Sequence, residues 1–196
     1  MKLLADAINN LKIKVRNYKY IPLVYSILKH DLLIGNFEVS LEKGEIELSE
    51  DILKSRYKTI LIALAIGLKK GLGRNIMLGI DLGLKNTGLA IALNSVIIWV
   101  GTLRDPYEVV KIINEIVTIT GIKPLAKLGV SPSVDRLVSD IKSKIILISK
   151  DIIGVREEDL SSITLKNLKF KKKLSEDQKA ALKILLWRSW LFWKNK

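Results

Sequence analysis

Residues 76–93, with the sequence IMLGIDLGLKNTGLAIAL, contain two apolar runs separated by a glycine-containing turn. The first run leads into a single carboxylate, Asp81, and the turn spans residues 83–88. Because the apolar residues are continuous rather than alternating, they predict strands buried on both faces. Burying a carboxylate there is costly unless a partner neutralises it, and a metal ion is one such partner. The stretch therefore predicts a buried hairpin with a binding residue at Asp81; a chance Asp in a buried hairpin is the alternative.

The residues after this hairpin predict an α/β order. A third strand would complete an antiparallel meander, and helices and strands then alternate to a final helix. The expected elements are strands at 96–103, 125–130 and 144–149, and helices at 106–120, 133–142 and from 175 onward. Short parallel strands covered by helices place a site at their carboxyl ends.

Composition excludes several classes of site. The chain has 196 residues, 48% of them hydrophobic, which suits one domain, or a core domain with a smaller appendage. No cysteine is present, which excludes disulfides, thiolate zinc sites and cysteine nucleophiles. One histidine, His30, argues against a Ser-His-Asp hydrolase or a multi-histidine metal site. Carboxylates are therefore the main catalytic groups that the chain offers.

The longest apolar run, residues 60–68, is far shorter than the roughly 20 residues that span a bilayer. The first ten residues include acidic and amide side chains where a signal peptide would be apolar. We therefore expect a cytoplasmic protein that does not act in a membrane.

A formal net charge of +13 and a pI near 9.8 indicate a polyanionic partner. A proteome rich in lysine and isoleucine is the alternative explanation. We favour nucleic acid.

Residues 1–75 carry no chemical motif. Their pattern predicts one or two amphipathic helices in 1–32, a hairpin at 36–48 and a helix from Ser49 to about Lys70. Gly71 and Gly73 form the expected boundary, so the predicted division is an N-terminal extension, 1–75, and a core domain, 76–196. The extension could contribute dimerisation, which would make a homodimer, or substrate binding.

The string Gly-Ile-Asp-Leu-Gly-x-Lys-x-x-Gly-Leu-Ala-Ile within 76–93 resembles the first-strand motif of the RuvC/YqgF-like nucleases. That family includes Holliday-junction resolvases and the enzyme that trims precursor ribosomal RNA. The resemblance implies an α/β, RNase H-like mixed five-stranded sheet flanked by helices, here with a small α+β N-terminal extension. The ATPase branch of the same fold has a similar turn, but 196 residues leave no room for its two lobes.

Three later segments also resemble this family. Residues 129–135, GVSPSVD, are similar to its Gly-x-Pro loop with a downstream Asp. Residues 146–151, ILISKD, occupy the position of a strand that ends in an Asp-Glu-Arg motif, whose arginine is missing here. Residues 175–186 resemble the last helix, which begins with a catalytic Asp; Ala180 stands where resolvases often carry a second acid.

The resemblance implies that Asp81, Asp151 and Asp177 act in catalysis and hold two divalent ions, Mg²⁺ or Mn²⁺. Oxygen ligands suffice for such hard cations. Each acid also has an ordinary interpretation. Asp177, after the N-cap Ser175, could simply complement the helix dipole, and Asp151 could end a strand in solvent. Residues 157–159, Glu-Glu-Asp, are interpreted as a helix start, and Asp135 as a reserve ligand.

Basic residues near these acids are candidate phosphate contacts, which add salt-dependent affinity without sequence information. They are Lys85, Lys166, Lys169, Lys171, Lys172 and Lys173. A solvated loop is the alternative for the run before the last helix. Trp187, Trp190 and Trp193 could stack on bases, but packing within the protein is the favoured interpretation.

The combined prediction is a metal-dependent endonuclease that hydrolyses phosphodiester bonds in structured nucleic acid, either a branched DNA junction or precursor RNA. The alternative is a non-catalytic nucleic-acid-binding protein with a degenerate RNase H-like domain. Convergence of distant acids on one point would favour the first.

Overall fold

The computed structural model describes residues 2–3, 11–15, 39–40, 46–130, 136–166, 168, 170 and 173–187. Its contacts divide the chain into two compact units. One consists of Met1–Arg74 and Leu93–Trp99, and the other of Asn75–Ala92 and Val100–Lys196. All of the candidate catalytic and phosphate-contact residues predicted from the sequence belong to the second unit.

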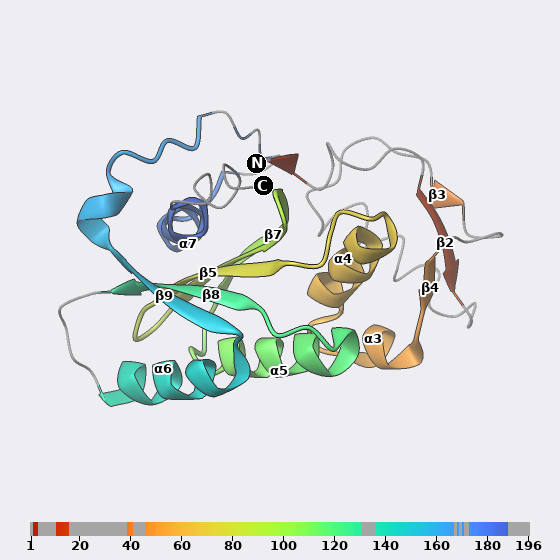
Figure 1. Ribbon diagram of the computed structural model, residues 1–196, viewed down its shortest axis with the longest axis horizontal. Coiled ribbons are helices and arrows are strands. Elements are labelled where there is room, and N and C mark those ends of the chain that lie inside the picture. Colours follow the sequence, from red (N-terminus) through yellow and green to blue (C-terminus); the bar gives the residue numbers. More distant parts are fainter. Residues whose placement is uncertain are drawn as a thin grey trace. The chain divides into compact units, whose positions relative to one another are not determined.

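A six-stranded sheet with the order β1-β7-β6-β5-β8-β9 forms the core (Figure 1). The strands are β1 (Lys2–Leu3), β5 (Ile76–Leu82), β6 (Thr87–Leu93), β7 (Val96–Leu103), β8 (Leu125–Val130) and β9 (Asp151–Arg156). Short turns join β5 to β6 and β6 to β7, so these neighbours run antiparallel. β8 pairs in parallel with β5, and β9 in parallel with β8. An antiparallel meander followed by parallel strands confirms the predicted RNase H-like fold; β1 adds a two-residue sixth strand at the β7 edge.

Helices cover both faces of this sheet. α5 (Glu108–Thr120) and α6 (Arg136–Ile148) lie on one face, and α7 (Glu176–Leu186) lies on the other (Figure 1). α5 ends where Gly121 adopts a φ of 67°, in the left-handed region that favours glycine. The central strands β5 and β6 are therefore buried on both faces, as their continuous apolar sequence predicts.

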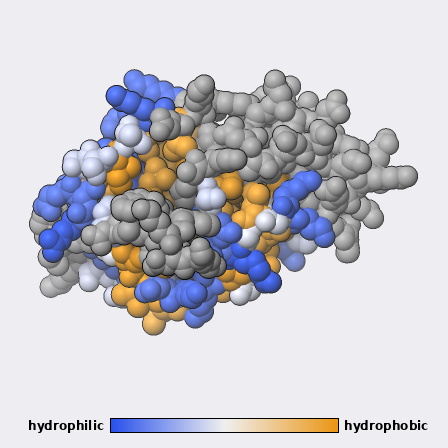
Figure 2. Space-filling view, turned by 45° about the horizontal axis from the view of Figure 1, so that its top comes forward, coloured by the Kyte–Doolittle hydropathy of each residue, from blue (hydrophilic) through white to orange (hydrophobic). Residues whose placement is uncertain are grey.

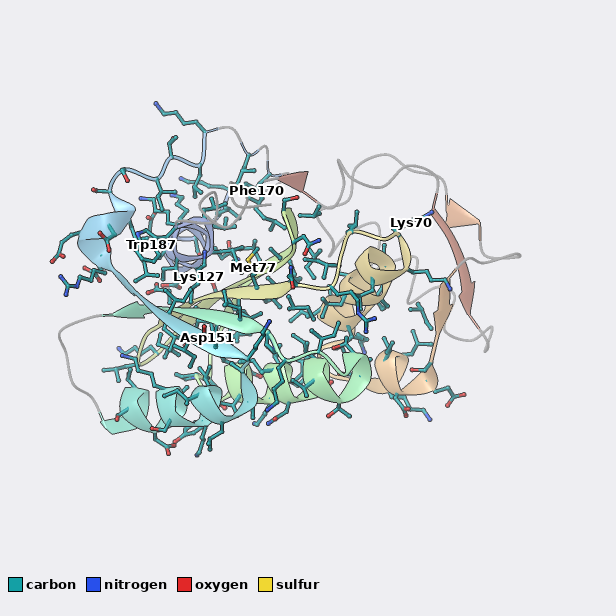
Figure 3. The ribbon with its side chains drawn as sticks, in the orientation of Figure 1. Lys70, Met77, Lys127, Asp151, Phe170 and Trp187 are labelled. Atoms are coloured by element: carbon teal, nitrogen blue, oxygen red, sulfur yellow. The ribbon has the colours of Figure 1, made fainter. Side chains whose placement is uncertain are left out.

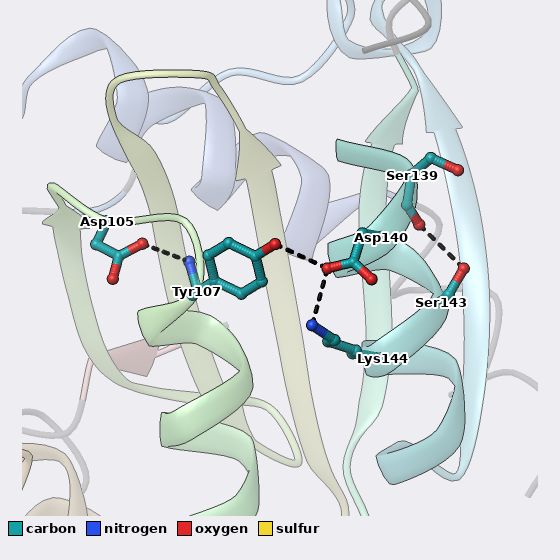
Figure 4. Close-up of polar contacts among 6 residues, drawn as sticks. All are labelled: Asp105, Tyr107, Ser139, Asp140, Ser143 and Lys144. Carbon is teal, nitrogen blue, oxygen red and sulfur yellow. Dashed lines mark hydrogen bonds and ion pairs between the residues drawn. The ribbon is translucent and has the colours of Figure 1, made fainter. Parts of the chain in front are cut away.

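A polar cluster connects α6 to the start of α5 (Figure 4). The Tyr107 hydroxyl donates to Asp140 at 2.8 Å, and the Lys144 ammonium donates to the same carboxylate oxygen at 2.8 Å. Lys144 also lies 4.8 Å from the centre of the Tyr107 ring, a cation–π distance. The carboxylate that accepts its hydrogen bond raises the pKa of Tyr107. These contacts fix the two helices on one face of the sheet.

The predicted strand at 144–149 is wrong. Those residues belong mostly to the last turns of α6, and the strand that follows is β9, which begins at Asp151. In α6, Ile141 and Ile145 are buried, whereas Ile146 and Leu147 are exposed by 59% and 75%. This is the one-sided burial of a helix; a short apolar run alone does not distinguish it from a buried strand. Figure 2 shows that apolar surface lies between hydrophilic patches on the face it presents.

The first unit contains α3 (Glu50–Lys54), α4 (Lys58–Lys69) and a small sheet with the order β3-β2-β4. Its strands are β2 (Leu11–Val15), β3 (Val39–Ser40) and β4 (Ile46–Leu48). Gly67 of α4 lies close to Leu93 and Ile98, so α4 packs on the outer part of the meander within this unit.

Three predictions for the first unit are corrected. β1 and β2 lie within 1–32, where helices were expected; the rest of that range, including His30, lies outside the described residues. The hairpin at 36–48 is wrong, because β3 and β4 both pair in parallel with β2 between them. The helix from Ser49 is interrupted after Lys54, although Ser49 is its N-cap as predicted. Alternating apolar residues identified the strands, but the sequence did not show that a third strand separates them.

Within the described part of the chain, no helix is both long and apolar enough to cross a membrane.

Candidate active site at the carboxyl end of the central strands

Asp81 lies near the end of β5 on the face that α7 covers. Side chains alternate along a strand, so Asp81 shares this face with Gly79. A Cβ at Gly79 would meet the backbone and side chain of Leu185 in α7 at 2.6 Å, which places α7 directly above this face. The Asp81 side chain is partly exposed, at the edge where the parallel strands end. This is the position that the sequence predicts for a binding carboxylate.

Three glycines allow α7 to lie against the sheet. A Cβ at Gly88 of β6 would lie 2.7 Å from the carbonyl carbon of Asp177 and closer still to its oxygen. A Cβ at Gly129 of β8 would lie 2.9 Å from the Ile184 side chain and 3.5 Å from the Asp81 carboxylate. Because Gly79, Gly88 and Gly129 have no side chain, the backbone of α7 approaches β5, β6 and β8 closely. Gly88 brings Asp177 onto the edge of the sheet that carries Asp81.

The start of α7 is fixed by side-chain hydrogen bonds. The Ser175 hydroxyl accepts from the Gln178 amide at 3.3 Å, and the Gln178 side chain accepts from the Ser175 amide at 3.0 Å, forming a capping box. The Ser175 hydroxyl also lies 3.1 Å from the Thr102 hydroxyl of β7. Asp177 therefore stands in the first turn of a helix whose N-terminus is hydrogen-bonded to the sheet. The predicted N-cap role of Ser175 is confirmed.

The electrostatics bring a third acid into this site. Burial raises the pKa of the Asp81 carboxyl, and the negative charges of Asp177 and Glu157 raise it further. Glu157 directly follows β9, and Val155, two residues earlier, packs against Ile184 of α7. Glu157 itself begins the 3₁₀ helix after the strand and is exposed. Asp177 and Glu157, from two distant parts of the sequence, thus both act on the Asp81 carboxyl.

Asp151, the third acid expected from the sequence, lies elsewhere. It begins β9 and pairs with Leu125 at the start of β8, whereas Gly129, beside Asp81, pairs with Val155. The Asp151–Leu125 pair and the Val155–Gly129 pair are four residues apart along the strands, a distance of about 13 Å. Asp151 is exposed, and its carboxylate accepts from the Ile152 amide at 2.8 Å. The structure therefore does not bring Asp151 beside Asp81, because the strand expected at 144–149 was misplaced and Asp151 begins a strand rather than ending one. Its catalytic role stays a prediction.

Glu157 was missed for the same reason. With β9 placed correctly, the Glu-Glu-Asp sequence of residues 157–159 follows a strand end directly, although sequence reasoning interpreted it as a helix start. It does form a short 3₁₀ helix, Glu157–Leu160, so the two interpretations are compatible. Asp135 lies outside the described residues.

The candidate phosphate contacts are only partly described. Lys85 is exposed in the turn between β5 and β6, next to the end of the strand that carries Asp81. Lys173 is exposed two residues before the N-cap of α7, and its charge is among the influences that lower the pKa of Glu176, after the ion pair with Lys179. Lys166 is exposed; Lys169, Lys171 and Lys172 lie outside the described residues. These positions stay predictions.

Trp187, at the C-terminus of α7, packs against a buried cluster of Val155, Leu160 and Ile184. Packing within the protein is therefore what the structure shows for this tryptophan. Trp190 and Trp193 lie outside the described residues.

The acids around Asp81 have the right chemistry to bind a hard divalent cation, but their side chains are not arranged as a metal site. Asp81, Asp177 and Glu157 offer only carboxylate oxygens, the ligands that Mg²⁺ and Mn²⁺ prefer. In the part of the chain that the structure describes, however, no group of three acidic or histidine side chains is arranged to hold a metal ion.

Comparison with known proteins finds similar solved structures only. No protein-family model matches the chain, and no curated protein matches its sequence. RuvC of Thermus thermophilus in complex with a Holliday junction substrate is similar in fold, with a TM-score of 0.44 and 13% identity; the match covers 62% of this chain and 96% of that one. Another Thermus thermophilus RuvC structure has a TM-score of 0.40 and 11% identity, covering 61% of this chain and 95% of that one.

Proposed function

We propose that this protein is a metal-dependent endonuclease that hydrolyses phosphodiester bonds in structured nucleic acid, either a branched DNA junction or precursor RNA. The observation that carries the proposal is that two other carboxylates act on the Asp81 carboxyl at the end of its strand. Asp177 and Glu157 raise the pKa of a partly buried Asp81, and a structural acid gains nothing from such neighbours. A bound cation would turn this repulsion into attraction.

In this proposal Asp81 is the central ligand, because its strand lies between the other two carboxylates. Asp177 approaches from the β6 side on α7, and Glu157 from the β9 side. Divalent ions bound there would activate water and stabilise the leaving oxygen. The α7 backbone, packed on Gly79 and Gly88, keeps Asp177 above the sheet edge. The proposal thus gives Glu157 the ligand role that the sequence had given to Asp151.

Substrate binding would rest on charge. With a net charge of +13, the chain attracts polyanions without reading their sequence. Lys85 and Lys173 are exposed on the two segments that carry Asp81 and Asp177, so they are suited to contact phosphates next to the scissile bond.

The proposal is tested by cleavage assays with a four-way DNA junction, a DNA duplex and a single-stranded RNA, each with Mg²⁺ or Mn²⁺. We expect the unmodified protein to cleave at least one of them, and Asp81→Asn to lose cleavage while keeping salt-sensitive binding. Asp151→Asn is the matched control, because it removes an exposed acid at the other end of the sheet and should leave the rate unchanged. Salt-sensitive binding without cleavage by any form would instead establish the non-catalytic binding protein.

A further inference from the structure

Lys127 is a charged residue in the centre of the fold. It lies in the middle of β8 and has 0% exposed surface. It shares the α7-facing side of the strand with Gly129, and its ammonium donates to the carbonyl oxygens of Leu185 at 2.9 Å and Trp187 at 2.6 Å (Figure 3). Burial lowers the pKa of this lysine to about 8. The proposed chemistry does not use it, so its presence needs another explanation.

The two carbonyls that Lys127 binds belong to the end of α7. The last carbonyls of a helix have no partner within the helix, and they form the negative end of its dipole. A buried ammonium at that position supplies donors and the complementary charge. An apolar side chain of similar volume would avoid the desolvation of a charge but could do neither.

We propose that Lys127 is a positioning residue that anchors the C-terminal end of α7 to β8 and thereby holds Asp177, at the other end of α7, beside Asp81. This inference rests on the proposed function. α7 has 11 residues and carries Asp177 in its first turn. The Ser175–Thr102 contact and the close approach at Gly88 hold that first turn, but a short helix held at one end can still tilt and turn about that end.

A second anchor removes this freedom. Without it, α7 could tilt or turn about its first turn and carry the Asp177 side chain away from Asp81. Lys127 resists this movement because it binds the helix on β8, the strand whose Gly129 lies against the Asp81 carboxylate. Asp81 lies on β5 and the anchor Lys127 on β8, and these two strands are paired neighbours in the sheet.

The test compares the full-length protein with Lys127→Met, which keeps the side-chain volume but removes the donors. Because a buried ammonium is removed, we expect an unchanged or higher Tm. We also expect faster hydrogen exchange at the α7 amides and cleavage at least about 10-fold slower through kcat, since a displacement near 1 Å costs up to about 100-fold. A residue with a merely structural role would lower Tm and leave kcat per folded molecule intact.

Rescue uses the absence of cysteine from the chain. Lys127→Cys can be alkylated in denaturant with 2-bromoethylamine, which forms a carbon–sulfur bond with loss of bromide and a proton and creates a lysine analogue at that position alone. After refolding, the aminoethylated protein should recover slow α7 exchange and cleavage, while the same variant alkylated with iodoethane should not. Equal exchange and cleavage in Lys127→Met and the unmodified protein would overturn the proposal.

The two proposals fail in different ways. If the unmodified protein cleaves nothing, the proposed function fails, but α7 exchange and Mn²⁺ binding, followed by electron paramagnetic resonance, still test the role of Lys127. Faster α7 exchange with weaker Mn²⁺ binding in Lys127→Met supports it. Unchanged exchange, or an increase spread evenly over all elements, refutes it.

Discussion

Gly88→Ala tests whether the contact between α7 and the sheet controls the candidate site. The added Cβ would lie 2.7 Å from the Asp177 carbonyl carbon and 3.1 Å from the Ala181 Cβ, with the Asp177 oxygen closer still. Backbone cannot turn aside as a flexible side chain does, so α7 must rise by about 1 Å to restore van der Waals distances near 3.5–4.0 Å. Overpacking of this kind destabilises by about 1–3 kcal/mol. A displacement of about 1 Å at a reacting group lowers the rate by about 100-fold.

The assay measures cleavage rate and thermal unfolding of Gly88→Ala beside a matched control, Gly121→Ala. Gly121 has a φ of 67° and nothing within 4 Å of an added Cβ, so its substitution strains the end of α5 without moving α7. That strain is about 1–2 kcal/mol, similar to the cost expected at Gly88. We expect both variants to lose Tm and only Gly88→Ala to lose activity beyond its folded fraction. Equal rates per folded molecule would refute the reasoning that the glycine contact positions Asp177.

Three further predictions follow from the charges around α7. Because burial and acidic neighbours raise the pKa of Asp81, the folded state disfavours its ionised form, so Asp81→Asn should raise Tm at pH 7 without metal; Mg²⁺ should then raise the Tm of the unmodified protein only. Glu157→Gln should lower the pKa of Asp81, measured by NMR titration, and slow cleavage, whereas Asp151→Asn should change neither. The pKa of Lys127 falls from 10.5 in the unfolded chain to about 8 in the folded protein, so the unfolded chain binds more protons between these two pH values. The loss of folding stability caused by burying the ammonium is therefore complete below pH 8 and disappears as the pH rises toward 10.5. The stability advantage of Lys127→Met, measured by urea unfolding, should therefore shrink over that range by up to about 3 kcal/mol, an upper bound because the two carbonyl acceptors favour the charged form.

The sequence predicted the central strands well because their signal is local. Apart from Asp81, the residues in 76–82, 87–93 and 96–103 are apolar or small, and tight turns separate the three segments, so type and boundaries were both clear. The strand at 125–130 and the helix ending at Thr120 were likewise predicted correctly. Each of these elements is defined by its own residues.

The errors arose where the outcome depends on distant residues. Residues 144–148 are apolar enough for a strand, and only packing on one side shows them to be helix. The strand was therefore predicted several residues too early in the chain. Asp151 was expected at its carboxyl end but lies at its start, and Glu157, which follows its true end, was not recognised. The parallel pairing of β2 with β3 and β4 is equally non-local. Propensity does not encode which strands become neighbours.

The charges at the two ends of α7 also explain how its direction is specified. The sheet surface under α7 contains Gly79, Gly88 and Gly129. Glycines have no side chains that could interlock with the helix and fix it in one orientation. Lys127 provides a direction, since its ammonium stabilises the negative end of a helix dipole and would repel the positive end. A reversed α7 would place its N-terminus on a buried cation and move Asp177 away from Asp81. An apolar residue at this position would make the core more stable than Lys127 does. Lys127, however, also selects the helix orientation that the proposed site requires.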